Sequence, residues 1–177
     1  MKKISWFAAV VGTVSLISVT VFSIIFWYSF AKNCEDYLKL AGDAPSIEKA
    51  DKFLGQALSY IEKENLTRGN SAYIFHTPKN DVGIWYEQIK GAKETTLFLL
   101  DKIENKPEIV SQLEQDNALM KIREVVLDSS QNGTSVTLPD AITWFPYQWG
   151  MFIWWWASII VSIGGWFFVK RASDGYY

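Results

Sequence analysis

Two long runs of apolar residues, separated by a polar segment, dominate the hydrophobic pattern of this chain. The first run, Ile4 to Phe30, contains no charged side chain and follows Lys2 and Lys3. The second, Trp149 to Val169, is equally free of charge and ends at Lys170-Arg171. An uncharged run of about 20 residues beside basic residues is typical of a membrane-spanning helix. The pattern predicts a hairpin that crosses a bilayer twice and carries one domain between its spans.

The segment between the two runs has the periodicity of short amphipathic helices. Apolar residues recur at three- and four-residue spacing in Ser46–Glu64, Val82–Glu104 and Glu108–Asp128. No pair of alternating strands is long enough for a sheet, and no repeat has a constant period. We therefore predict an all-α membrane protein in which two transmembrane helices form an antiparallel hairpin flanking an external domain of three or four short helices.

Other segments of the polar region lack this periodicity or connect the helices. We expect the first helix to continue through Lys32–Leu40 and to stop at Ala41–Pro45, which contains Gly42 and Pro45. In Ser71–Asp81 we expect Tyr73, Ile74 and Phe75 to pack on the bundle, and Asn80 or Asp81 to cap the next helix. The remaining segments are predicted as a break at Asn105-Lys106-Pro107, a loop over Ser129–Thr134 and an extended stretch over Val136–Pro139.

These patterns divide the chain into five parts. They are a cytoplasmic N-terminus (1–3), a first transmembrane helix (4–30), an external helical domain (31–146), a second transmembrane helix (147–169) and a cytoplasmic tail (170–177).

Aromatic residues gather at the ends of both apolar runs. The sequence is 16% aromatic and contains nine Trp. Trp6 and Trp27 are separated by roughly 31 Å at the rise of a helix, which matches a hydrocarbon core. Aromatic rings prefer the headgroup zone, and basic side chains mark its cytoplasmic side. The predicted membrane-interface anchors are Trp6, Trp27, Tyr28, Trp149, Trp166, Lys170 and Arg171.

Charge indicates the orientation of the hairpin. Of 17 basic and 19 acidic residues, four and one lie at the short ends, which leaves 13 and 18 between the spans. Short basic segments stay cytoplasmic, whereas a long segment is translocated largely regardless of its charge. We expect an integral membrane protein, with a bacterial inner membrane favoured, both termini cytoplasmic and the central domain outside, in a periplasm, a lumen or the extracellular space. An acidic domain repels phosphates, so no nucleic-acid partner is expected.

The N-terminal run has an alternative interpretation as a signal peptide. Lys2-Lys3, an apolar run and Ser29-Phe30-Ala31 are similar to a secretion signal with its cleavage site. The apolar run is longer than the usual signal core of about 7–15 residues, which favours a retained anchor.

Small residues at four-residue spacing predict close helix packing. Ala8 and Gly12 lie four apart in the first span, Ser158 and Ser162 four apart in the second, and Gly165 lies nearby. Small residues let two helix backbones approach closely. These faces either pair the two spans within one hairpin or contact another subunit, and the sequence leaves both open.

Candidate catalytic chemistry is sparse in the sequence. His76 is the only histidine and Cys34 the only cysteine, so an internal disulfide and a Cys-pair metal site are excluded. We interpret Cys34 as a structural thiol, with a disulfide between two copies as the alternative. Carboxylates alternate with Lys on helical faces, which is typical of solvated surfaces. We predict no catalytic residue, no cofactor and no metal site; an enzyme would need His76 or a carboxylate pair to converge with Tyr73 and Trp85.

Transport and cofactor binding have little support. Neither span contains an ionisable residue, and only hydroxyls interrupt the runs, so a Ser/Thr-lined pore in an oligomer is a minor alternative. We expect those hydroxyls to bond their own helix or a neighbouring one. Trp154-Trp155-Trp156 point in three directions about 100° apart, and lipid or helix contact is favoured over a quinone or pigment.

The favoured function is that of a non-enzymatic accessory subunit or scaffold of a membrane protein complex. Its external helical domain would contact other membrane-protein subunits or a second copy, and its spans would contact the lipid bilayer. The alternative is a sensor or ligand-binding input module that signals through a separate partner, because a helical domain between two spans has the layout of such modules.

Overall fold

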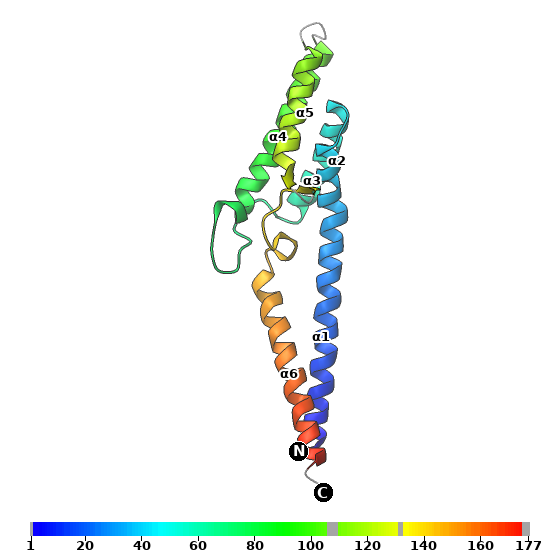
Figure 1. Ribbon diagram of the computed structural model, residues 1–177, viewed down its shortest axis with the longest axis vertical. Coiled ribbons are helices and arrows are strands. Elements are labelled where there is room, and N and C mark those ends of the chain that lie inside the picture. The colour runs from blue at the N-terminus through cyan, green and yellow to red at the C-terminus, as the bar shows by residue number, and fades with distance from the viewer. Residues whose placement is uncertain (1, 106–109, 131–132, 175–177) are drawn as a thin grey trace. The chain divides into compact units, whose positions relative to one another are not determined.

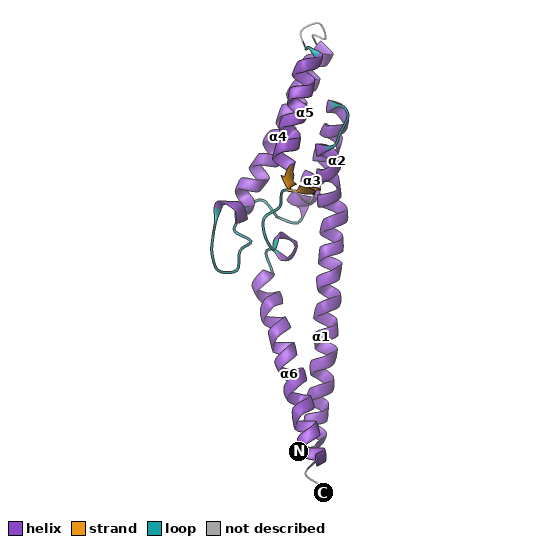
Figure 2. Ribbon diagram, viewed as in Figure 1, coloured by secondary structure: helices purple, strands orange, loops and turns teal. Residues whose placement is uncertain are grey.

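The computed structural model describes residues 2–105, 110–130 and 133–174, and it is mostly helical (Figures 1 and 2). The chain divides into two compact units, which we call the two-helix unit (Met1–Trp27 with Tyr147–Tyr177) and the central unit (Tyr28–Pro146). The prediction of a mostly helical protein is confirmed. Two helices, Ile4–Gly42 and Gln148–Arg171, are long and apolar enough to cross a membrane.

The two-helix unit contains α6 (Gln148–Asp174) and α1 (Lys2–Phe30) as far as Trp27, and these helices lie side by side (Figure 1). Apolar residues occur on every side of both helices, so neither helix has a polar face. Ala9, Val19 and Met151 are buried, whereas most of the large apolar side chains of α1 and α6 are exposed. The unit is therefore apolar on its outside.

Beyond α1 the helix continues without a turn into the central unit. A π-helical segment, η1 (Ala31–Glu35), closes with the Asp36 amide bonded to the Ala31 carbonyl, and α2 (Asp36–Gly42) follows. The predicted continuation and its stop at Ala41–Pro45 are confirmed. Phe30, Cys34, Leu38 and Ala41 are buried at three- and four-residue spacing, so this stretch contributes one face to the core of the central unit.

Helix α3 (Ile47–Lys63) has the start and stop that its sequence predicts. The Ser46 side chain accepts a hydrogen bond from the Lys49 amide at 3.4 Å. At the other end Asn65 takes a left-handed conformation with φ of 58°, and the Leu66 amide bonds the Ile61 carbonyl at 2.8 Å. This is a Schellman cap with Asn in place of Gly. The residues of α3 buried in the core are Ile47, Ala50, Leu54, Ala57, Leu58 and Ile61.

Helix α4 (Val82–Asn105) and helix α5 (Gln112–Val126) complete the bundle. The Asp81 carboxylate caps α4 by accepting from the Ile84 amide at 3.0 Å, whereas Asn80 is buried in the loop before it. Ser111 caps α5 by accepting from the Glu114 amide at 3.2 Å. The residues of α4 buried in the core are Val82, Trp85, Ile89, Ala92, Thr96 and Leu99. The predicted break at Asn105-Lys106-Pro107 and the predicted start at Glu108 lie mostly outside the described residues.

A short β-hairpin corrects the expectation that the chain contains no sheet (Figure 2). Strand β1 (Leu127–Ser130) pairs antiparallel with β2 (Gly133–Val136), and Leu127 lies opposite Val136. The helix predicted to Asp128 ends at Val126. The strands contain mostly Ser, Asp and Thr and have no apolar alternation, so periodicity could not identify them. The predicted loop over Ser129–Thr134 was wrong at both ends, because β1 extends to Ser130 and β2 begins at Gly133. Gln131 and Asn132 lie outside the described residues.

The segment 71–81 corrects a second expectation. Ile74 and Phe75 were expected to pack on the bundle, but they are 73% and 79% exposed. Tyr73 alone is half-buried, and burial raises the pKa of its hydroxyl. The base of the segment is ordered by an isolated bridge between Asn70 and Asp81 and by the short 3₁₀ turn η2 (Pro78–Asn80). Apolar character alone does not identify what covers a side chain.

Candidate functional site

In the two-helix unit, each helix has a glycine residue that lies directly against the backbone of the other helix. A β-carbon added at Gly12 would lie 2.5 Å from the amide nitrogen of Ser162. One added at Gly165 would lie 2.5 Å from the amide nitrogen of Ala9. No real β-carbon tolerates such distances, so only glycine permits this packing. The predicted residues Gly12, Ser162 and Gly165 are thus brought together within one chain.

Hydroxyl groups join the same two helices. The Ser15 and Ser158 hydroxyl oxygens lie 2.8 Å apart, and those of Thr13 and Ser162 lie 3.1 Å apart. The Trp154 indole donates to the Ser15 hydroxyl oxygen at 2.9 Å. These hydrogen bonds lie among apolar side chains, where a competing water molecule would be costly to admit.

Ala8 is placed differently from Gly12 and Ser162. It is only half-buried, and its neighbour Ala9 supplies the contact with Gly165. The sequence did not single out Ala9. Contact with a neighbouring helix was one of the two alternatives expected for Thr13, Ser15 and Trp154, and each of them contacts the other helix. The register between two helices had no signal in the sequence.

The predicted interface anchors are exposed. Trp6, Trp27, Tyr28, Trp149 and Trp166 each expose roughly half of their surface, and Lys170 and Arg171 are also exposed. The Trp166 indole donates to the Thr13 hydroxyl at 3.2 Å, so this ring also joins α6 to α1. Of the three consecutive Trp residues, Trp154 contacts α1 through Ser15 and Phe22, with ring centroids of Phe22 and Trp154 5.9 Å apart.

Three further hydroxyls of α1 bond their own helix, which is one of the two predicted alternatives. Ser18, Thr20 and Ser23 each donate to the carbonyl four residues earlier, at 2.8–2.9 Å. Such bonds satisfy a hydroxyl without any partner from another helix. These three hydroxyls therefore need no water-filled path to be satisfied.

The central unit carries an apolar groove between α4 and α5. The groove has a volume of about 410 Å³, and its lining residues are Thr95, Phe98, Leu99, Ser111, Leu113, Glu114, Asn117, Ala118 and Lys121. Leu113 and Phe98 are 68% and 60% exposed. Lys102 bridges the two helices at one side, 3.2 Å from the Glu114 carboxylate and 4.7 Å from the centre of the Phe98 ring. Phe98 and Leu113 are thus exposed in a groove with two basic side chains, because Lys121 lines it and Lys102 lies at one side.

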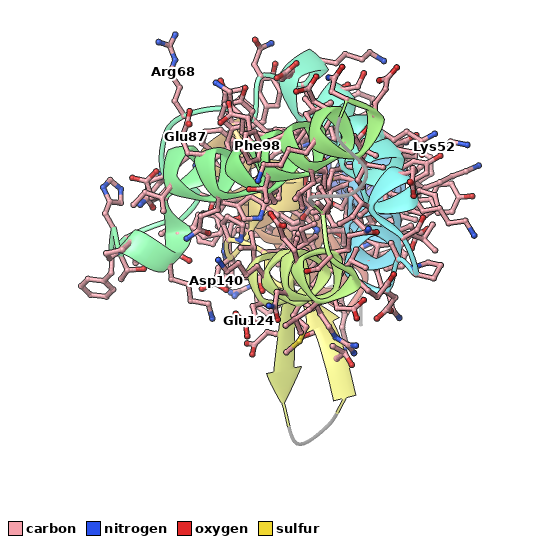
Figure 3. All side chains as sticks on the ribbon, turned by 90° about the horizontal axis from the view of Figure 1, so that it is seen from above. Lys52, Arg68, Glu87, Phe98, Glu124 and Asp140 are labelled. Carbon is pink, nitrogen blue, oxygen red and sulfur yellow. The ribbon has the colours of Figure 1, made fainter. Side chains whose placement is uncertain are left out.

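A second, more polar groove lies against α3. Its volume is about 420 Å³, and its lining residues are Asn33, Tyr37, Lys52, Gly55, Gln56, Ser59, Tyr60 and Lys63. Burial raises the pKa of the Tyr60 hydroxyl. Lys52 points away from the helices, as do other charged side chains such as Arg68 (Figure 3). This face has the character of a solvated surface.

One ion pair is nearly buried between α3 and α4. The Lys93 ammonium lies 2.6 Å from the Asp51 carboxylate and donates to the Asp51 carbonyl at 2.9 Å. The fully buried Thr96 hydroxyl donates to the same carboxylate at 2.7 Å. All three polar groups have partners, so the cluster stabilises the packing of α3 on α4.

The residues considered for catalysis differ in their exposure to solvent. His76 is exposed in the 71–81 segment, whereas Trp85 is buried and its indole donates to the Thr137 carbonyl at 2.9 Å. Cys34 is fully buried, so a disulfide between two copies would need local unfolding. Across residues 2–105, 110–130 and 133–174, no three His, Cys, Asp or Glu side chains are grouped closely enough to hold a metal ion.

Comparisons with known proteins give no relative for the chain: no family model, no curated protein and no solved structure matches it.

Proposed function

We propose that the protein is a non-enzymatic accessory subunit or scaffold of a membrane protein complex, with its central unit as the interaction surface. In this proposal α1 and α6 form an antiparallel hairpin across a bilayer. Both termini are cytoplasmic, and residues 31–146 form the external domain.

Exposure of the apolar helices supports membrane insertion. A core helix of a soluble protein buries most of its apolar residues. Here only 17% of the apolar window of the first helix and 11% of that of the second are buried. Contiguous apolar surface of this extent needs a cover, and lipid is the cover that suits helices that are apolar all round.

Packing between α1 and α6 supports retention of the first span. Cleavage after Ala31 would remove the residues that contact Gly165, Ser158 and Ser162. The Ser162 hydroxyl would then lose Thr13 as a partner in a medium without water, which is costly, whereas the Ser158 hydroxyl would keep its bond to the Trp154 carbonyl. A retained first helix is the arrangement that keeps these contacts.

The observation that carries the interaction proposal is the open groove between α4 and α5. Exposed Phe98 and Leu113 offer apolar area, and Lys121 stands at its rim. Interfaces commonly combine an apolar centre with a polar or charged rim. The proposed occupant is a partner protein that inserts an apolar side chain between α4 and α5 and places a carboxylate beside Lys121.

A photocrosslinking experiment tests this assignment. A benzophenone amino acid replaces Leu113 in the groove or, as a control, Ile84, which is also exposed on α4. Irradiation of native membranes is expected to give a discrete adduct from position 113 only. Lys121→Glu should reduce that adduct several-fold, whereas Lys52→Glu, on another face, should leave it unchanged.

Two outcomes would contradict the proposal. Equal adducts from positions 113 and 84, or an adduct that ignores Lys121→Glu, would mean that the groove is not the interface. If a small metabolite binds in the groove and raises thermal stability, and no protein adduct forms, the scaffold proposal is contradicted and the sensor alternative is supported.

A further inference from the structure

The segment 70–81 is a closed loop with an ordered base. The Ser71 amide donates to the Asn80 carbonyl at 3.0 Å, and the buried Ser71 hydroxyl donates to the same carbonyl at 3.3 Å. The Ala72 amide donates to the Asn70 side chain at 3.0 Å. Because both ends of the loop are bonded together, its tip is held out from a defined base.

The tip of this loop is apolar and uncovered. Ile74 and Phe75 are adjacent, and they are the two large apolar side chains with the highest exposure among the described residues apart from Ile4, which lies at the start of α1. Isolated exposed apolar residues are common, but an adjacent aliphatic and aromatic pair at a loop tip is typical of a contact surface.

The base of the loop is joined to the segment that leads into α6. Gly69 has φ of 111°, and a β-carbon there would lie 2.8 Å from the Phe145 ring. The Asp140 amide donates to the Asn80 side-chain oxygen at 3.3 Å. Phe145 precedes the first residue of α6, Gln148, by three positions, a chain length of at most about 11 Å. The loop base is therefore tied, through Phe145, close to the point at which the second apolar helix begins.

The charges around the tip suit a phospholipid headgroup layer. The loop contains one lysine, Lys79, and Arg68 lies just before the loop. Arg68 points away from the helices (Figure 3). Basic side chains favour anionic headgroups, and an aromatic ring is stable at the boundary between headgroups and acyl chains. The carboxylate of the loop, that of Asp81 at its last position, caps α4 by accepting from the Ile84 amide at 3.0 Å.

We infer that Ile74 and Phe75 insert into the headgroup–acyl boundary of the same bilayer that α1 and α6 cross. The inference rests on the membrane insertion in the proposed function. It gives the central unit a third attachment to the membrane besides its two connections to the apolar helices, and this attachment limits rotation of the unit above the bilayer.

Depth-dependent fluorescence quenching tests the inference on the full chain. In a Cys34→Ala background, single cysteines at Phe75, Leu97 or Ile17 carry an environment-sensitive fluorophore. Each variant is reconstituted in vesicles of phosphatidylcholine and phosphatidylglycerol that contain nitroxide lipids, labelled either near the headgroup or deep in the acyl chain. Leu97 is an exposed control on α4, and Ile17 is an exposed reporter on α1.

The expected pattern has three parts. Phe75→Cys should be quenched several-fold more by the shallow nitroxide than Leu97→Cys. Ile17→Cys should be quenched most by the deep nitroxide, and Leu97→Cys should respond only to a water-soluble quencher. If the probe at position 75 behaves like that at 97 while that at 17 is quenched deep in the bilayer, the loop inference fails and membrane insertion stands. If the probe at 17 is not quenched by lipid, membrane insertion fails and the loop inference with it.

Discussion

The amide nitrogen of Ser162 lies 2.5 Å from the position that a β-carbon would take on Gly12. The backbones of α1 and α6 therefore meet at a point where one helix has no side chain. Ser15 and Ser158 add a hydroxyl contact at 2.8 Å on the same pair of helices. These small residues therefore pack against each other within one chain.

Gly12→Leu should separate the two helices. A leucine side chain cannot fit against the Ser162 backbone, so α6 must shift or rotate. The measurement is oxidative crosslinking of Ser15→Cys with Ser158→Cys in a Cys34→Ala background in membranes. The disulfide should form readily with Gly12 and several-fold less with leucine at that position.

Gly164→Leu is the matched control for this prediction. A β-carbon at Gly164 has nothing within 4 Å, whereas one at the adjacent Gly165 meets the Ala9 backbone. Gly164→Leu should leave crosslinking unchanged, and Gly165→Leu should reduce it as Gly12→Leu does. Equal yields from all three variants would show that α1 and α6 do not pack through these residues.

Asp51→Ala should destabilise the central unit. The change removes the carboxylate that binds Lys93 at 2.6 Å and the buried Thr96 hydroxyl at 2.7 Å. Loss of a partner from a nearly buried polar cluster costs about 1–3 kcal/mol of unfolding free energy. Thermal unfolding of the full chain in detergent, followed by circular dichroism, should show a midpoint several degrees lower.

The matched control is Asp43→Ala, at the exposed pair with Arg123. Their charged groups are 3.7 Å apart and both side chains are about half exposed. An exposed pair contributes about 0–1 kcal/mol, so the midpoint should hardly change. A larger loss from Asp43→Ala than from Asp51→Ala would contradict the assigned role of the Asp51–Lys93 cluster.

Cys34 should resist alkylation in the folded protein and should make stability fall at high pH. Burial raises the pKa of its thiol, and the Glu35 charge raises it further. An unfolded thiol ionises near its ordinary value of 9.0, whereas the folded thiol stays neutral there. Ionisation then favours the unfolded state, so the stabilising contribution is complete below about pH 9 and is lost as the pH rises beyond it.

The measurement compares thermal unfolding of the natural chain and Cys34→Ala from pH 7 to 10. Above pH 9 the unfolding midpoint of the natural chain should fall relative to that of Cys34→Ala. Iodoacetamide should label Cys34 only after denaturation. Rapid labelling at neutral pH, or a disulfide-linked dimer in native membranes, would show that the thiol is accessible.

Periodicity predicted the helices but not their register or their surroundings. The spacing of Ile47, Leu54 and Ile61 defined the buried face of α3, and all three are buried. A helix face with several small residues does not reveal which of them contacts the other helix. The four-residue spacing predicted Ala8, whereas Ala9 makes the contact with Gly165.

Two other features lacked a usable signal in the sequence. The strands β1 and β2 have one apolar residue each, Leu127 and Val136, which lie opposite each other, and a pattern along one chain does not show this pairing. Leu113 and Phe75 have the hydrophobicity of core residues but are exposed. Their exposure could not be predicted, because hydrophobicity alone does not distinguish a residue buried in the fold from one on the surface.

The central claim, that the chain is an accessory subunit of a membrane complex, is tested most directly by its native mass and composition after extraction from its own membrane in mild detergent. The chain is expected to co-purify with other polypeptides at a fixed ratio, and Lys121→Glu is expected to weaken this association whereas Lys52→Glu is not. Recovery of a lone polypeptide of 20.2 kDa under conditions that keep other membrane complexes intact would contradict it.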